Sequence, residues 1–228
     1  MVDRMAEMNF CFTDLGYSNL IEEGYGSVKL NKVVSVVGDL MYDAAKFESK
    51  KERNGSEMCQ DILSRYSDYA LVTVHRASNT DEKEVLEAII ADLNCLNVNT
   101  KIVMLTHPRT RAKLKEFNIK AEFELFEPLG YFDVMQLIKK ASMVITDSGG
   151  LIREAYFFET KGLFILSDPV WPELVEAGVC VNVAPVKSAI FDEFNRFSKI
   201  DVTWISGLFG DGNAGEKILQ KITNYINK

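Results

Sequence analysis

From Tyr69 onward, short apolar segments alternate with longer amphipathic ones along the chain. The apolar segments are rich in β-branched residues and predict strands, whereas the amphipathic segments have the apolar spacing of helices. The expected strands are YALVTV (69–74), KIVMLT (101–106), FELFEPL (123–129), MVIT (143–146), GLFIL (162–166) and CVNVA (180–184). Helices are expected at 81–96, 109–117, 132–141, 149–158 and 172–177, followed by a final helical region that includes 214–226. This alternation predicts an α/β fold, with a Rossmann-like parallel sheet covered by helices on both faces.

The first 68 residues have a different pattern. NFCFT (9–13), a helix in YSNLIEEG (17–24) and KVVSVVGD (32–39) make only one βαβ-like unit, which is too short for a domain. We therefore expect residues 1–45 to be a remnant of an amino-terminal domain, and 46–68 to be a linker or helical connection. Within that connection the charged segment 46–61 is expected to be a linker or surface loop. Residues 69–228 are expected to form the Rossmann-like domain.

Composition narrows the function classes. With 47% hydrophobic residues among 228, the chain can bury a large core, and a net charge of -7 argues against general binding to nucleic acid or to an anionic membrane. No basic leader and no apolar run of about 18 residues is evident, so neither a signal peptide nor a membrane span is expected. The separated cysteines contain no CxxC pair, which favours a reducing cytoplasmic location and indicates no metal site or redox cofactor. They are Cys11, Cys59, Cys95 and Cys180.

Chemically informative residues follow three of the expected strands. His75 comes after YALVTV, His107 after KIVMLT, and Asp147 with Ser148 after MVIT. Ligands of open parallel sheets bind beyond the carboxyl ends of the strands. A single histidine is more often structural than catalytic. Because the only two histidines of the chain both lie at this edge, we expect at least one of them in a functional site.

Two adjacent glycines stand where the helix after MVIT begins. A glycine inside a helix costs about 1 kcal/mol relative to alanine, so Gly149 and Gly150 call for an explanation. One explanation is an anion site, because a helix start offers unpaired N–H groups and a missing Cβ lets a phosphate approach the backbone. The alternative is a tight strand-to-helix turn in which Ser148 is an ordinary N-cap. Glu154 lies one turn beyond Gly150, where a carboxylate can bind ribose hydroxyls, although exposed helix glutamates are common. Together these residues indicate a nucleotide site, but neither the dinucleotide fingerprint nor the P-loop motif occurs.

Six segments in this order resemble the carboxyl-terminal half of the non-hydrolysing UDP-N-acetylglucosamine 2-epimerases. They are TVHRASNTD (73–81), LTHPRTR (105–111), FEPLGYFD (126–133), TDSGGLIREA (146–155), PELVEAG (172–178) and FGDGNAGEKI (209–218). The resemblance implies that 69–228 is a UDP-binding Rossmann-like domain, the carboxyl-terminal domain of a GT-B fold. In that fold the substrate lies between two Rossmann-like domains.

The resemblance also implies roles for individual residues of the nucleotide site. Ser148, Gly149 and Gly150 would hold the diphosphate, and Glu154 would bind the ribose. The uracil would lie against backbone groups near Leu129 and Gly130.

Further implied roles concern the edge of the cleft. His75 matches the active-site histidine, Arg76 an arginine that contacts the nucleotide-sugar effector, and His107 a second cleft histidine. Arg109 is expected on the same rim, although exposed arginines are often only solvated. Two positions depart from the family pattern: Ser78 replaces an acidic residue, and Ser167 stands where an arginine is usual.

The implied activity is interconversion of UDP-GlcNAc and UDP-ManNAc by anti elimination and re-addition of UDP, in polysaccharide biosynthesis. The family's main catalytic carboxylates are expected outside these residues, so the chain alone is expected to bind UDP without catalysis, as part of a longer protein or the product of a truncated gene. Two alternatives stay open: a GT-B glycosyltransferase using a UDP-sugar, and a non-catalytic nucleotide-sugar-binding module. Expected partners are UDP, a UDP-N-acetylhexosamine and a second copy of the chain in a homodimer, with no nucleic acid, membrane or cofactor.

Overall fold

The computed structural model describes residues 2–27, 32–51, 54–166 and 170–227, and the chain divides into two compact units. One unit is Arg53–Trp204, and the other combines Met1–Glu52 with Ile205–Lys228. The expected boundaries placed 205–228 with the Rossmann-like domain, whereas the structure groups these residues with the amino-terminal segment. The reason is that residues 205–228 are hydrogen-bonded to the amino-terminal segment within that smaller unit.

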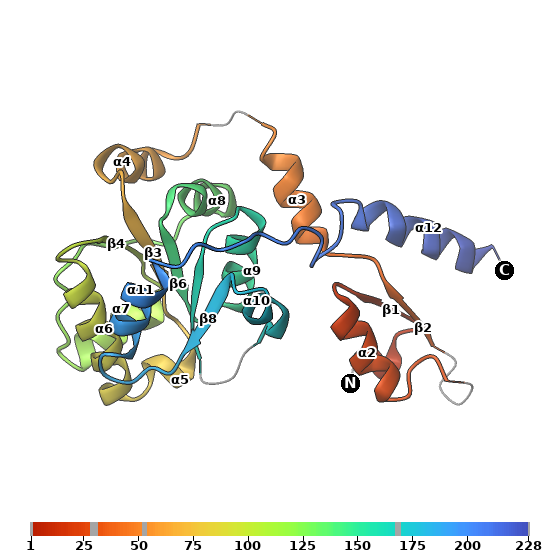
Figure 1. The fold of residues 1–228 in the computed structure, drawn as a ribbon, viewed down its shortest axis with the longest axis horizontal. Helices are drawn as coiled ribbons and strands as arrows, with labels where there is room; N and C mark the ends of the chain where they lie inside the picture. Colours follow the sequence, from red (N-terminus) through yellow and green to blue (C-terminus); the bar gives the residue numbers. More distant parts are fainter. Residues whose placement is uncertain (1, 28–31, 52–53, 167–169, 228) are drawn as a thin grey trace. The chain divides into compact units, whose positions relative to one another are not determined.

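The larger unit is built on a six-stranded parallel sheet with the order β5-β4-β3-β6-β7-β8 (Figure 1). Leu71 of the central strand β3 lies opposite Val103 of β4 and Val144 of β6. This sheet confirms the expected parallel architecture. Its strands are β3 (Tyr69–Thr73), β4 (Lys101–Leu105), β5 (Leu125–Phe126), β6 (Met143–Thr146), β7 (Gly162–Ile165) and β8 (Cys180–Val183).

Helices cover both faces of this sheet (Figure 1). Alternate residues of each strand point to opposite faces, so Ala70 and Val72 pack in one apolar cluster while Tyr69 and Leu71 pack in the other. The first cluster includes side chains of α6 (Lys83–Leu96), α7 (Pro108–Glu116) and α11 (Ala189–Phe197). The second includes side chains of α4 (Glu57–Arg65), α8 (Tyr131–Lys140) and α9 (Gly149–Phe157). Short helices α5 (Ala77–Thr80) and α10 (Pro172–Glu176) follow β3 and β7.

The charged segment 46–61 is not simply a linker or surface loop, as expected from its composition. Its last residues enter helix α4, which begins after the N-cap Ser56. The Ser56 hydroxyl accepts a hydrogen bond from the Cys59 N–H, and the Ser56 N–H donates to Asp133 of α8. Cys59 and Ile62 are fully buried in the second cluster. Packing of one narrow apolar stripe therefore stabilises a helix in a mainly polar segment.

The smaller unit contains the expected βαβ arrangement, in which β1 (Met8–Cys11) pairs in parallel with β2 (Val33–Val36). The connecting helix α2 (Asp14–Glu22) ends just before Gly24, whose φ of 90° suits a glycine after a helix end. Hydrogen bonds join the end of the chain to this segment: the Asp39 N–H donates to the Phe209 carbonyl, the Gly215 N–H to the Asp43 carboxylate, and the Lys46 ammonium to the Asp211 carbonyl. The other helices here are α1 (Val2–Met5), α3 (Leu40–Glu48) and α12 (Ala214–Ile226). None of the helices in the described ranges is long and apolar enough to span a bilayer.

Candidate functional site

Three neighbouring strands bring the predicted residues to one edge of the sheet. Because β4, β3 and β6 are adjacent and parallel, His107, His75 and Ser148 all lie beyond carboxyl ends of strands, as expected. The two imidazole rings are 5.9 Å apart between centroids and meet edge to face. Residues far apart in the sequence therefore share one end of the larger unit.

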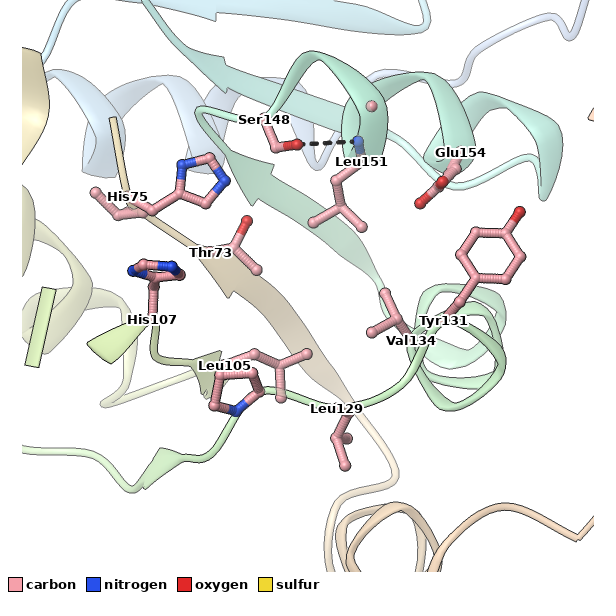
Figure 2. Close-up of a pocket in the computed structure, with 13 residues that line it drawn as sticks. Thr73, His75, Leu105, His107, Leu129, Tyr131, Val134, Ser148, Leu151 and Glu154 are labelled. Carbon is pink, nitrogen blue, oxygen red and sulfur yellow. Dashed lines mark hydrogen bonds between the residues drawn. The ribbon is translucent and has the colours of Figure 1, made fainter. Parts of the chain in front are cut away.

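A pocket of about 300 Å³ opens at this edge (Figure 2). Figure 2 shows the two histidines at one end, Glu154 and Tyr131 at the other, and Ser148 between them. Its wall combines apolar side chains with a few polar groups, which is typical of a small-molecule site. The lining residues are Thr73, Val74, His75, Leu105, His107, Pro128, Leu129, Tyr131, Val134, Ser148, Gly150, Leu151 and Glu154.

Helix α9 begins at the wall of this pocket. The Ser148 hydroxyl oxygen accepts a hydrogen bond from the Leu151 N–H at 3.3 Å, so Ser148 is the N-cap. Its hydroxyl proton can still donate to another group, since a hydroxyl both donates and accepts. Among the described residues, the N–H groups of Gly149 and Gly150 have no acceptor. The helix start thus presents donors and the positive end of the helix dipole.

The two glycines differ in what surrounds them. A Cβ on Gly149 would lie 3.3 Å from Val170 Cγ1 and 3.5 Å from the Trp171 indole nitrogen, which itself donates to the Gly149 carbonyl. Among the described residues, a Cβ on Gly150 would meet only the Ser148 hydroxyl oxygen, at an ordinary 3.8 Å. Neither glycine has a positive φ. Close packing against Trp171 therefore accounts for Gly149, whereas nothing in the described chain requires a glycine at position 150.

Glu154 lies one helical turn beyond Gly150, on the same side of α9. Its side chain is largely buried, with the residue only 9% exposed, and it lines the pocket together with Gly150. The helical spacing predicted this common face, and the pocket confirms that both residues reach it. A carboxylate at this depth can accept hydrogen bonds from a ligand that enters the pocket.

The loop before α8 supplies the opposite wall. Pro128 and Leu129 line the pocket, whereas Gly130 is the exposed N-cap residue of α8 and is not among the lining residues. Within the described chain, a Cβ on Gly130 would have no heavy atom within 4 Å, so it would point into open space. Of the two predicted loop residues, the structure therefore places Leu129 in the pocket and Gly130 beside it.

Asp147 organises the turn after β3, a role that the sequence analysis did not assign. Its fully buried carboxylate accepts hydrogen bonds from the backbone N–H of His75 at 2.9 Å and of Arg76 at 2.8 Å, and from the Asn79 amide at 3.1 Å. Its other oxygen lies 3.5 Å from His75 Nδ1. Asp147 therefore links the turn that carries His75 to the start of α9. The sequence feature that could have indicated this role is the position of Asp147, a carboxylate directly after the expected strand MVIT.

The predicted rim residues have different surroundings. Arg76 and Arg109 are not among the described lining residues. The Arg76 guanidinium lies over the Phe164 ring, 5.7 Å from its centroid. The Arg109 guanidinium donates to both carboxylate oxygens of Asp81 at 2.6 Å, and this hydrogen bonding lowers the pKa of Asp81. His107 lines the pocket, and its Nδ1 accepts a hydrogen bond from the Arg109 N–H at 3.2 Å.

The two departures from the expected pattern have different outcomes. Ser78 lies on the short helix α5 with its side chain exposed, and no hydrogen bond or ion pair of that side chain with a described residue replaces the expected acidic contact. Ser167 lies outside the described residues.

Comparison with known proteins finds a family that the chain matches over most of its length. A family model described as UDP-N-acetylglucosamine 2-epimerase matches residues 1–223. A UDP-2,3-diacetamido-2,3-dideoxy-D-glucuronate 2-epimerase from Pseudomonas aeruginosa is 31% identical over 96% of this chain and 60% of its own length. A UDP-N-acetylglucosamine 2-epimerase homolog from Methanococcus maripaludis is 32% identical over 98% of this chain and 62% of its own length. This chain thus spans about 60% of the length of these curated relatives.

A solved structure extends the likeness to the fold. The crystal structure of Methanocaldococcus jannaschii UDP-GlcNAc 2-epimerase in complex with UDP-GlcNAc and UDP matches 97% of this chain and 62% of that chain. The TM-score is 0.84 and the sequence identity is 29%. This agrees with the fold class expected from the sequence, the carboxyl-terminal domain of a GT-B fold.

Proposed function

Because the chain belongs to the UDP-N-acetylglucosamine 2-epimerase family, we propose that its pocket binds the UDP moiety of a UDP-sugar. The activity that we propose for the whole protein is 2-epimerisation, which interconverts UDP-GlcNAc and UDP-ManNAc. The family is one of isomerases. The observation that carries the proposal is Gly150, an exposed glycine at a helix start that no contact within the described chain requires.

The diphosphate is assigned to the start of α9. The N–H groups of Gly149 and Gly150 and the hydroxyl of Ser148 supply donors, and the helix dipole favours a negative charge there. Without a Cβ at Gly150, a phosphate oxygen can approach the backbone closely. The net charge of -7 does not oppose this assignment, because these donors act over hydrogen-bond distances.

The nucleoside is assigned to the end of the pocket that contains Glu154 and Tyr131 (Figure 2). The Glu154 carboxylate would accept hydrogen bonds from the two ribose hydroxyls. The uracil would lie against Leu129 and the backbone near Gly130. This arrangement directs the sugar toward His75 and His107, because Ser148 lies between the two ends.

The reaction needs groups that this pocket supplies only in part. In the proposed reaction the C2 proton is removed and UDP leaves C1 in an anti elimination. UDP then adds back to C1 while a proton is returned to C2 from the opposite face, which inverts C2. Proton transfer at C2 requires positioned acids and bases. Among the described lining residues the histidine and carboxylate side chains are those of His75, His107 and Glu154. With Glu154 assigned to ribose, we propose that His75 assists at the sugar and that this chain alone binds UDP without inverting C2.

Isothermal titration of the chain with UDP tests the nucleotide site. We expect binding that Glu154→Ala weakens about tenfold or more, because two hydrogen bonds to a carboxylate are lost. The matched control is Glu87→Ala, which removes an exposed glutamate from helix α6 and should leave the affinity unchanged. If a folded wild-type chain does not bind UDP, the proposed function is wrong.

An activity assay tests the second part of the proposal. We expect no conversion of UDP-GlcNAc by the chain alone, no release of UDP and no exchange of the C2 proton in deuterated water. Detectable inversion would show that the described residues include the essential acid and base.

Three further expectations stay predictions: the rim positions of Arg76 and Arg109, the homodimer and the cytoplasmic location. Light scattering tests the homodimer.

A further inference from the structure

Thr73 is a pocket residue without an assigned role. It is the last residue of β3, half-buried, and lies between His75 and the start of α9 (Figure 2). Its hydroxyl oxygen is 2.6 Å from the hydroxyl oxygen of Thr146, the last residue of β6. The Thr146 oxygen in turn accepts a hydrogen bond from the Ser148 N–H at 2.9 Å. The Thr73 hydroxyl is therefore two hydrogen bonds away from the proposed diphosphate site.

The position of the protons follows from burial. Thr146 is fully buried, so its hydroxyl proton needs an acceptor inside the protein. Within the described ranges, Thr73 Oγ1 is the only acceptor in hydrogen-bond distance of that hydroxyl. Thr146 is therefore the donor in the pair and Thr73 the acceptor. The proton of Thr73 is not used in this bond and, because a hydroxyl carries one donor and two lone pairs, it remains available to the pocket.

From this geometry we propose that the Thr73 hydroxyl donates a hydrogen bond to a phosphate oxygen of the bound nucleoside diphosphate. Thr146 acts as the positioning residue that orients it, by occupying one acceptor position of the Thr73 oxygen. The donors to the diphosphate then come from two strand ends, β3 and β6, and not from α9 alone. This inference rests on the proposed function, since it assigns a further contact to the same nucleotide.

The test compares the folded chain with three variants by titration with UDP and with uridine, which has no phosphate. Thr73→Val keeps the shape of the side chain and removes the donor, so UDP affinity should fall about tenfold or more. Uridine affinity should stay within about twofold of the wild-type value. Thr73→Ser keeps the hydroxyl and should bind UDP nearly as well as the wild type. The matched control is Thr160→Val, which removes a buried hydroxyl that donates to the Ile138 carbonyl and does not line the pocket.

Thr146→Val supplies a second readout of the proposed orientation. We expect it to weaken UDP binding in the wild-type background, and to have little further effect when Thr73 is already valine. Equal losses of UDP affinity in both backgrounds would overturn the positioning role of Thr146. Thermal unfolding of each variant identifies losses that come only from misfolding, and Thr73→Ser retains the hydroxyl if Thr73→Val does not fold.

The outcomes separate this inference from the proposed function. If the wild type binds UDP and Thr73→Val binds it equally well, the Thr73 contact is wrong and the nucleotide site stands. Equal weakening of UDP and uridine by Thr73→Val would also overturn it, because the effect would not depend on phosphate. If the folded wild type binds neither ligand, the proposed function and this inference fail together.

Discussion

Helices α7 and α9 begin at the same edge of the sheet, yet only one of the two starts is open. At α7 the imidazole of His107 accepts the Arg109 N–H, and Pro108 occupies the first helical position without any N–H. At α9 the cap is the small hydroxyl of Ser148, and the two positions that follow are glycines. The dipoles of the two helices have the same sign at this edge, so the dipole by itself does not distinguish them.

The difference lies in access to the backbone. A proline ring and a capping imidazole cover the start of α7, and the arginine in its first turn already pairs with Asp81. At α9 the N–H groups of Gly149 and Gly150 are unpaired within the described chain, and Gly150 lines the pocket. An anion site therefore requires unpaired donors and room for the ligand in addition to a helix end.

The largest expected effect comes from closing the open start. Gly150→Val should abolish detectable UDP binding, because a branched side chain would occupy the space assigned to the diphosphate. Gly150→Ala should weaken binding less, while it raises the free energy of unfolding by about 0.5–1 kcal/mol through helix propensity, since its Cβ meets no close neighbour. Calorimetric titration and denaturant unfolding measure the two effects. Unchanged UDP affinity in Gly150→Val would leave the second glycine without a ligand-based explanation.

Replacing the N-cap residues of α7 and α9 distinguishes effects on the free energy of unfolding from effects on UDP affinity. Ser148→Ala and His107→Ala should each lower the free energy of unfolding by about 1 kcal/mol, because each loses one hydrogen bond to a helix N–H group. Only Ser148→Ala should also weaken UDP binding about tenfold, since its hydroxyl is assigned to the diphosphate. Equal weakening by both variants, measured by titration, would mean that the two helix starts contribute alike.

A smaller effect is expected at the neighbouring glycine. Gly149→Ala should lower the free energy of unfolding by about 1 kcal/mol, because the new methyl group would crowd Val170 and Trp171. Gly150→Ala, which has no such neighbours, is the matched control for helix propensity. A stability gain in Gly149→Ala equal to that in Gly150→Ala would show that Trp171 yields and that packing does not require this glycine.

The smallest effect is expected at the exposed ion pair of α7. Arg109→Ala should change neither the unfolding midpoint nor the UDP affinity measurably, because exposed pairs contribute little and Arg109 does not line the pocket. Arg109 lowers the pKa of Asp81 in the folded state, so any contribution is present at neutral pH and disappears as the pH falls below the usual aspartate range. Thermal unfolding at neutral and acidic pH measures this. A clear loss of UDP affinity would show that Arg109 contributes to the nucleotide site.

Periodicity predicted most strands of the larger sheet well because both faces of a parallel sheet are covered, and its strands are continuous apolar runs. The edge strand is the exception, since β5 is only Leu125–Phe126 within the expected 123–129. The strands β3, β4 and β6 begin at the predicted residues and end within one residue of the prediction. Residues 46–68 were expected only as a linker or helical connection, and the bounds of helix α4 were not predicted, because only a few apolar positions, such as Cys59 and Ile62, stabilise it in a polar segment. Its partner α8 lies some seventy residues away in sequence, beyond any local signal.

Some residues of the site could be predicted from the sequence and others could not, depending on whether their neighbours are close in sequence. Glu154 and Gly150 lie on one helix, so their spacing alone placed them on a common face. Thr73 and Asp147 depend on neighbours from another strand, and nothing local indicates that Thr146 or the His75 turn lies beside them. Their contacts join residues about seventy positions apart.

The sequence by itself determined the α/β class, the glycine pair at a helix start and the family resemblance, because these depend on residue type and short-range spacing. The tertiary structure alone decided which strand ends are neighbours, and therefore that His107, His75 and Ser148 share one pocket wall. It also decided which glycine is explained by packing and which is not. The physical reason is that burial, hydrogen-bond partners and open space depend on contacts between segments that are distant in sequence. Short-range residue patterns therefore do not reveal them.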